Sequence, residues 1–209
     1  MTGVTLTGEN LKKVFNRRII FDSIDIAVGG GATLLVTGRN GSGKSTLVKI
    51  LCGLLTPTQG SVALTVDGKS AGEHRRDFLG LVAPYLQMYD EFSADENLRF
   101  ALSARGRPQD PDRIGRLLER VGLERRRRDP VRTFSSGMKQ RLKYAFSLVH
   151  EPVVLMLDEP MANLDADGVT MVRDVMEEQR TRGILVIATN DRSDVDVHEY
   201  QVELVATRG

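Results

Sequence analysis

The chain has 209 residues, and its 29 Lys and Arg side chains against 28 Asp and Glu side chains leave a formal net charge of +1 at pH 7. This balance argues against a dedicated nucleic-acid binder, which usually carries a strongly basic surface. The apolar runs at 153–157 and 184–188 have five residues each, far below the roughly 20 needed to cross a bilayer. The single cysteine excludes an intrachain disulfide, and the first residues lack the apolar core of a secretory signal, so we expect a cytoplasmic protein.

The N-terminal region alternates apolar and polar residues. Within residues 2–28 the apolar side chains Ile24, Ile26 and Val28 are separated by single residues, and the same alternation returns at 62–66. A period of two is typical of a strand with one face in water. These stretches therefore predict a small antiparallel β-sheet.

Buried strands alternate with helices elsewhere in the chain. Short apolar runs rich in β-branched residues lie at 33–37, 153–157 and 184–189, and helical spacing follows the first two at 46–55 and 169–180. Strand, helix and strand in this order predict a parallel α/β sheet.

The middle of the chain, about 85–150, has no convincing strand pattern. Segments 96–104, 111–121 and 137–149 have helical spacing, and Asp110 followed by Pro111 is a typical helix start. We therefore expect one domain over residues 1–209, in which a helical lobe is inserted into the α/β core.

A phosphate-binding loop follows the first buried strand. The motif begins at Gly38 and ends at Ser45, and it matches every fixed position of that pattern. Glycines let backbone N–H groups turn toward an anion, and the next helix adds a positive partial charge. Lys44 would reach the β- and γ-phosphates, while the Ser45 hydroxyl would bind Mg²⁺. The alternative, a flexible loop, is disfavoured because strand, motif and helix coincide. The expected nucleotide-binding residues are Gly38, Arg39, Asn40, Gly41, Ser42, Gly43, Lys44, Ser45 and Thr46.

Two consecutive acids end the buried strand at 153–157. Asp158 is placed to hold Mg²⁺, directly or through water, and Glu159 to polarise the attacking water as general base. A strand that simply ends in solvated acids is the alternative. The phosphate loop earlier in the chain favours the catalytic interpretation.

Three further segments resemble ABC-type ATPases. The segment from Phe134 to Arg141 is similar to the signature of that family, residues 158–160 follow as they do there, and residues 162–165 match its D-loop. This resemblance runs in family order from Phe15 to Asn190. It implies a P-loop NTPase fold with a RecA-like parallel-sheet core, an N-terminal antiparallel subdomain and an inserted helical lobe, with ATP and Mg²⁺ as cofactors.

The resemblance also implies a head-to-tail pair of ATPase subunits, either a homodimer or two paired chains. Signature residues of one subunit would close over the γ-phosphate held by the other, with Asp165 in the D-loop. A plain N-cap of the following helix is the alternative for the serines, and both roles can hold together. The signature residues are Ser135, Ser136, Gly137 and Met138.

Phe15 falls where the family has an aromatic side chain that stacks on adenine. A core residue of an edge strand is the alternative, but polar and basic neighbours favour a position at the rim of the site.

Two positions depart from the family pattern. Counting back from Glu96, the usual glutamine would fall near Pro84, so Gln87 is the candidate for its role at Mg²⁺ or the catalytic water, and a surface loop residue is the alternative. Asn190 stands where the family has a histidine facing the γ-phosphate. Its amide can donate one hydrogen bond but cannot become cationic.

Four consecutive arginines, Arg125 to Arg128, lie between Glu124 and Asp129. We interpret this short run as a solvated helix end rather than a nucleic-acid site.

Two functions fit the resemblance. The first is the ATP-hydrolysing subunit of a membrane transporter, an exporter by its compact size, held at the inner face of the cell membrane by integral membrane permease subunits. Residues 165–169 are similar to the ATP-binding subunit of the cytochrome c maturation haem exporter. The second is a soluble ABC ATPase acting on ribosomes or DNA. A single phosphate loop and a compact lobe favour the transporter, with no nucleic-acid partner expected.

Overall fold

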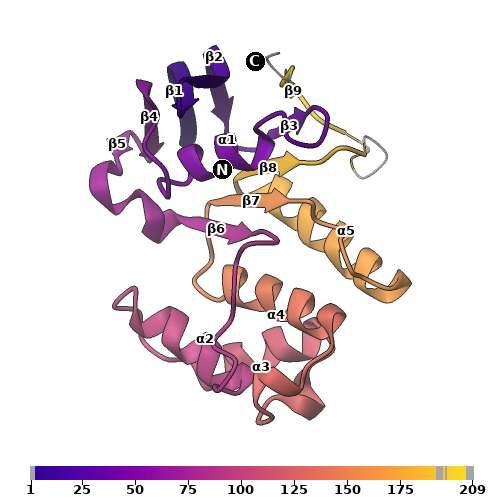
Figure 1. Cartoon of the computed structure of the whole chain (residues 1–209). Coiled ribbons are helices and arrows are strands. Elements are labelled where there is room, and N and C mark those ends of the chain that lie inside the picture. Colours follow the sequence, from indigo (N-terminus) through magenta and orange to yellow (C-terminus); the bar gives the residue numbers. More distant parts are fainter. Residues whose placement is uncertain (1–2, 192–194, 196, 206–209) are drawn as a thin grey trace.

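An antiparallel sheet and a parallel sheet form the frame of the protein (Figure 1). The computed structural model describes residues 3–191, 195 and 197–205. The antiparallel sheet has the order β2-β1-β4-β5, with bounds β1 (Val4–Phe15), β2 (Arg18–Gly29), β4 (Gln59–Val66) and β5 (Lys69–Ser70). Asn16 and Arg17 join β1 to β2 with φ of 47° and 67°, as a two-residue hairpin turn requires. The antiparallel sheet predicted from the alternating residues is confirmed.

The second sheet is parallel throughout and has the order β6-β7-β8-β3-β9. Its strands are β3 (Thr33–Thr37), β6 (Leu79–Val82), β7 (Val154–Asp158), β8 (Ile184–Ala188) and β9 (Tyr200–Glu203). The three predicted strands are present, with bounds that differ by at most one residue at either end. The sequence did not predict β6 and β9, because one is four residues with an internal glycine and the other is mostly exposed.

Five α-helices accompany the sheets in the described ranges. They are α1 (Lys44–Leu51), α2 (Ala94–Ser103), α3 (Pro111–Arg120), α4 (Ser136–Leu148) and α5 (Ala166–Arg182). The cap predicted for α3 is confirmed, since Asp110 accepts a hydrogen bond from the Arg113 N–H at 3.0 Å. Helix α1 ends four residues before its predicted end at 55, because the chain turns at Gly53 with φ of 75°. No helix in the described part is long and apolar enough to span a membrane.

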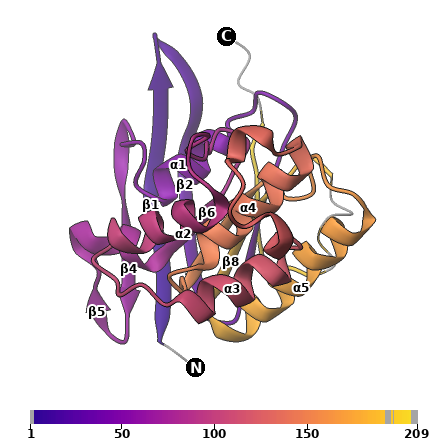
Figure 2. The same ribbon diagram turned by 90° about the horizontal axis from the view of Figure 1, so that it is seen from below.

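The parallel sheet separates two apolar cores. Leu155 and Leu157 of β7 face the core shared with α2, α3, α4 and α5, whereas Val154 and Met156 face the core shared with α1 and the antiparallel sheet. This alternation buries the strand on both faces, as a parallel sheet requires. Helices α2, α3 and α4 lie together on the side away from the antiparallel sheet in Figure 1, and Figure 2 shows them from their outer side. The predicted helical segment thus packs against one face of the sheet.

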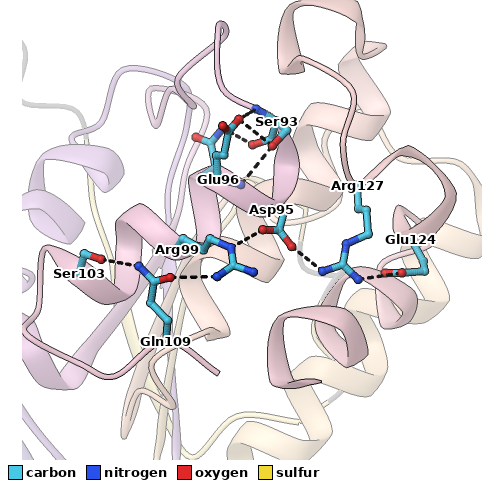
Figure 3. A network of polar contacts seen from close by, with 9 residues as sticks. Ser93, Asp95, Glu96, Arg99, Ser103, Gln109, Glu124 and Arg127 are labelled. Carbon is cyan, nitrogen blue, oxygen red and sulfur yellow. Dashed lines mark hydrogen bonds and ion pairs between the residues drawn. The ribbon is translucent and has the colours of Figure 1, made fainter. Parts of the chain in front are cut away.

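The arginine run is partly structural. The Arg127 guanidinium pairs with Asp95 at the start of α2 and donates to Glu124 Oε1 at 3.0 Å, while Asp95 also accepts from Arg99 (Figure 3). The predicted solvated helix end is therefore wrong for Arg127. The reason is that its partner lies 32 residues away in sequence, which no local pattern reveals. Burial alone would raise the pKa of Asp95, but the two arginines outweigh it and hold that pKa below its usual value.

Replacing Asp95 by Ala should lower the free energy of unfolding by about 1–3 kcal/mol, because two guanidinium groups lose a largely buried acceptor. The Asp95 carboxylate stabilises the fold above its unfolded pKa, and this contribution is lost as pH falls through its lowered folded pKa. Urea unfolding followed by circular dichroism should therefore show weaker acid destabilisation in the variant. Asp129→Ala, which breaks the more exposed pair with Arg126, is the control and should cost less than about 1 kcal/mol.

Candidate functional site

The phosphate-binding loop connects β3 to α1, and its backbone needs glycine. Gly38 and Gly43 have φ of 144° and 105°, where side chains are strained. A Cβ on Gly38 would lie 2.4 Å from the carbonyl oxygen of Leu204, and one on Gly43 would lie 2.5 Å from Cγ2 of Ile20. Gly43 is also the N-cap of α1 and has no side-chain oxygen for the first N–H groups of the helix. Those N–H groups are therefore suited to an anion.

Lys44 lies across this loop. Its side chain is 6% exposed, and its Nζ donates to the carbonyl oxygen of Gly38 at 2.9 Å and lies 3.7 Å from Glu159 Oε1. The hydroxyl of Ser42 is buried and has no hydrogen-bond partner among the described residues. A buried cation and an unpaired hydroxyl within one loop suit the oxygens of a phosphate group.

Asp158 occupies the carboxyl end of β7 and is fully buried. Burial raises the pKa of its carboxyl group, and Ser45, Lys44 and Lys49 only partly oppose this shift. Neither carboxylate oxygen has a well-formed hydrogen bond within the described ranges. A buried carboxylate without partners, close to a serine hydroxyl, is the donor set that a small divalent cation would satisfy. The residues present therefore fit Mg²⁺, with Ser45 and Asp158 as its ligands.

Glu159 and Asn190 flank the loop from two neighbouring strands. Glu159 follows β7 with φ of 50°, and its N–H donates to the carbonyl oxygen of Ala188 at 2.8 Å. Asn190 lies just beyond β8, and its Nδ2 donates to Asn40 Oδ1 at 3.3 Å. The structure thus brings both predicted residues to the phosphate-binding loop. A groove of about 500 Å³ lies at Asn190, and its lining residues are Thr37, Gly38, Arg39, Asn40, Asn190 and Glu203.

Phe15 and Gln87 lie at exposed positions. Phe15 ends β1 at the hairpin tip, is 44% exposed, and has Lys13 Nζ 4.8 Å from its ring centroid, which agrees with a rim position. Gln87 is exposed in the loop between β6 and α2. No hydrogen bond among the described residues joins its side chain to the phosphate-binding loop. Adenine stacking by Phe15 stays a prediction.

Sequence reasoning missed Tyr85, which is in the same loop as Gln87. Its hydroxyl is buried and has no hydrogen-bond partner in the described ranges, and its ring lies 3.9 Å, measured to the centroid, from Lys49 Nζ of α1. Burial, and to a lesser extent the charge of Asp158, raises the pKa of this phenol, so it stays neutral. One feature of the sequence could have indicated Tyr85. It directly follows Pro84, which is the position where the family glutamine was expected.

The signature segment begins α4. Ser135 caps this helix by accepting from the Met138 N–H at 3.2 Å, which confirms the predicted N-cap. Ser135 and Ser136 are exposed, and Gly137 and Met138 are half-buried. Within the part of the chain that the structure describes, no hydrogen bond connects these four residues to the phosphate-binding loop. Their action on a nucleotide held by a second subunit stays a prediction.

The D-loop residue Asp165 is tied to two helices. Its Oδ1 caps α5 by accepting from the Gly168 N–H at 2.9 Å, and it accepts from Arg141 Nη2 of α4 at 2.5 Å. These two donors, Arg141 first, hold the pKa of Asp165 below its usual value. The hydroxyl of Tyr144, also on α4, donates to the carbonyl oxygen of Pro160 at 2.8 Å. Helix α4 is thus fixed to the segment that follows Glu159.

Comparison with known proteins matches this chain to ATP-binding proteins of ABC transporters. A family model described as ABC transporter matches residues 21–162. The lantibiotic transport ATP-binding protein SrtF of Streptococcus pyogenes is 33% identical over 189 residues, which cover 90% of this chain and 81% of that protein. The cytochrome c biogenesis ATP-binding export protein CcmA of Nitrosomonas europaea is 31% identical over 198 residues, covering 92% and 93% respectively. The lipoprotein-releasing system ATP-binding protein LolD of Alcanivorax borkumensis is 35% identical over 199 residues, covering 90% and 87%.

A solved structure has the same architecture. The ATP-binding subunit of an ABC transporter superposes with a TM-score of 0.83 at 25% sequence identity, covering 97% of this chain and 88% of that one.

Asp158→Asn should stabilise the protein without nucleotide by about 1–3 kcal/mol at neutral pH, because it removes a buried and unpaired charge. Since the folded pKa of Asp158 is raised, the charge destabilises the fold above that pKa and costs nothing below the unfolded pKa of about 3.9. The gain in thermal midpoint should therefore shrink as pH is lowered. Asp174→Asn, an exposed position on α5, is the control. Equal midpoints of Asp158→Asn and the parent protein at neutral pH would contradict the prediction.

Proposed function

Because the chain belongs to the ABC transporter family as an ATP-binding subunit, we propose that it hydrolyses ATP to drive export through separate membrane subunits. Its fold is the predicted P-loop NTPase architecture. The observation that carries the proposal is the meeting of Lys44 with Glu159, across 3.7 Å, beside the buried and unpaired Asp158. The phosphate-binding loop thus carries a cation, Lys44, and faces both a candidate metal ligand, Asp158, and a candidate base, Glu159.

The residues divide the chemistry between them. The loop N–H groups and Lys44 hold the β- and γ-phosphates, and Ser45 and Asp158 hold Mg²⁺, which neutralises phosphate charge when bound. In this proposal Glu159 accepts a proton from the attacking water, and its position beside Lys44 supports that role at the γ-phosphate end. Asn190, held by Asn40, donates an amide hydrogen bond from the neighbouring strand. Phe15 stacks on the adenine ring in this proposal.

A second ATPase subunit completes the site in this proposal. Ser135 and Ser136 are exposed at the start of α4, whose N-terminal N–H groups and positive partial charge suit an anion. Binding of ATP would draw this segment of one subunit onto the γ-phosphate held by the other. The single domain over residues 1–209 would then act as one half of a head-to-tail pair.

This chain has a groove in which the proposed membrane partner would dock. A cavity of about 170 Å³ opens between the end of α1 and α4, with Leu54, which is 55% exposed, at its rim. Its lining combines the polar side chains Arg76, Arg105 and Ser147 with the apolar side chains Cys52, Leu54, Leu79, Leu81, Leu86 and Phe146. Since the groove is shared by the α/β core and the helical segment, relative movement of the two would change its shape. We assign it to an amphipathic cytoplasmic segment of the permease, which would hold this protein at the inner face of the membrane.

Export is the direction we favour, because two of the named relatives are an export protein and a lipoprotein-releasing protein. The likeness of residues 165–169 to the haem-exporter subunit supports the same direction. In this proposal the membrane subunits, not this chain, determine which substrate is transported. The competing function, a soluble ATPase on ribosomes or DNA, predicts co-sedimentation with those particles instead of with membranes.

Glu159→Gln should reduce ATP turnover by at least about 100-fold, because the amide cannot accept the proton of the attacking water. ATP binding should persist and trap a dimer, which light scattering after gel filtration measures. Exposed Glu119→Gln is the matched control and should hydrolyse normally. Lys44→Ala, purified in parallel, reports any contaminating ATPase, and turnover of Glu159→Gln above that background would remove Glu159 as the base.

Leu54→Arg should weaken binding to the membrane subunits at least about tenfold, because it replaces an exposed apolar contact at the rim by a third cation, beside Arg76 and Arg105 of the groove. The ATPase rate of the isolated protein should be unchanged. Val205→Arg, at an apolar position that is 78% exposed outside the groove, is the control. Binding would be measured by co-purification with a partner that contains several apolar segments of about 20 residues. Equal recovery of both variants would contradict the groove assignment.

A further inference from the structure

The loop after β6 leaves the parallel sheet beside Asp158. Strand β6 pairs with β7 in parallel register, with Val82 opposite Leu157. The next residues of the two strands, Ala83 and Asp158, therefore lie at the same edge of the sheet. Ala83 is fully buried, and the chain that follows it starts at the metal-ligand end of the site.

Tyr85 is the residue of this loop whose ring packs against α1. Its ring lies against Lys49 Nζ at 3.9 Å from the centroid. Lys49 is one helical turn beyond Ser45 on α1, so the two residues share a face of that helix. The charge of Asp158 also acts on Tyr85. The phenol thus lies against the helix that carries Ser45 and within electrostatic reach of Asp158.

The hydroxyl of Tyr85 needs an acceptor. It is buried and has no hydrogen-bond partner among the residues described, and the same holds for both oxygens of Asp158. Buried polar groups without partners are rare in folded proteins, and several in one place mark a position that a polar ligand fills. Gln87, two residues later, is exposed and makes no such contact.

Helix α4 holds this part of the loop in place. Lys143 Nζ donates to the carbonyl oxygens of Ala83 at 3.0 Å and Pro84 at 3.3 Å. Both acceptors directly precede Tyr85 in the chain. The backbone that leads into Tyr85 is therefore held by the helix that begins with the signature residues.

We propose that Tyr85, rather than Gln87, is the side chain by which the loop after β6 contacts the bound Mg²⁺ and nucleotide, donating its hydroxyl hydrogen to an oxygen of the hydrated metal. This inference rests on the proposed nucleotide-binding function. In this role Tyr85 is a neutral donor, so it supports metal hydration without competing with Asp158 for the cation. A tyrosine hydroxyl also reaches farther than a glutamine amide, which suits a loop whose usual glutamine position is Pro84.

Metal affinity tests the proposal directly. In a Glu159→Gln background, which prevents turnover, Mn²⁺ serves as a paramagnetic substitute for Mg²⁺, and free Mn²⁺ is titrated by electron paramagnetic resonance with ATP present. Tyr85→Phe keeps the ring on Lys49 and removes only the hydroxyl. It should weaken Mn²⁺ binding in the ATP complex about tenfold, the loss expected for one hydrogen bond to a charged centre. Affinity for ATP without metal should be unchanged.

Two control variants make the result specific. Gln87→Ala and Tyr89→Phe change the same loop at exposed positions and should bind Mn²⁺ as the parent does. The chain has four tyrosines and no tryptophan, so tyrosine fluorescence gives a second measurement. A change in emission on adding Mg²⁺ to the ATP complex should be lost in Tyr85→Phe and kept in Tyr89→Phe.

The outcomes separate this inference from the proposed function. Unchanged Mn²⁺ affinity in Tyr85→Phe, or a loss found in Gln87→Ala instead, would overturn the assignment of Tyr85 alone. Failure of the parent protein to bind ATP with metal would overturn the proposed function and this inference together.

Discussion

Parallel pairing of β3, β8 and β7 is the constraint on which the site depends. Val36, Ala188 and Asp158 lie at one level of the sheet, because Val36 pairs with Ala188 and Ala188 pairs with Asp158. The residues that follow each strand therefore emerge along one edge, although Val36 lies more than 100 positions before the other two in the chain. The strands are buried on both faces, so their ends cannot shift without disturbing two cores. This rigidity is what places the loop, the acids and the asparagine together.

The same edge holds polar groups whose burial is unfavourable for folding. Asp158 is fully buried and its pKa is raised, and the hydroxyls of Ser42 and Tyr85 are buried without partners in the described part of the chain. Glu159 has a left-handed backbone conformation as well. Such groups weaken the fold while the site is empty, and in the proposed function the buried polar groups would gain partners from bound phosphate and a divalent cation. Stability and ligand affinity are thus opposed at this edge, and ligand binding would recover what the empty site loses.

The sequence predicted the parts of the fold that local residues determine. Strand β3 was placed at its observed bounds, and the phosphate-binding loop lies where its motif predicted, because pattern and function reside in adjacent residues. Strand β6 was missed because four residues with a glycine carry little local signal. Arg127 was misinterpreted and Tyr85 overlooked for a different reason. Their roles depend on Asp95 and Lys49, which lie far away in the chain and are brought close only by the tertiary fold.

Helix α4 links the two ends of the proposed mechanism. At its start it presents the signature residues, and along its length Arg141, Lys143 and Tyr144 contact the D-loop, the loop after β6 and the segment after Glu159. These contacts come from about one turn of one helix, residues 141–144, so a displacement of α4 would reach all three segments together. The same helix contributes Phe146 and Ser147 to the docking groove. A contact made on a partner's nucleotide at one end of α4 would therefore alter both the hydrolytic residues and the membrane-facing groove, with no separate relay needed between them.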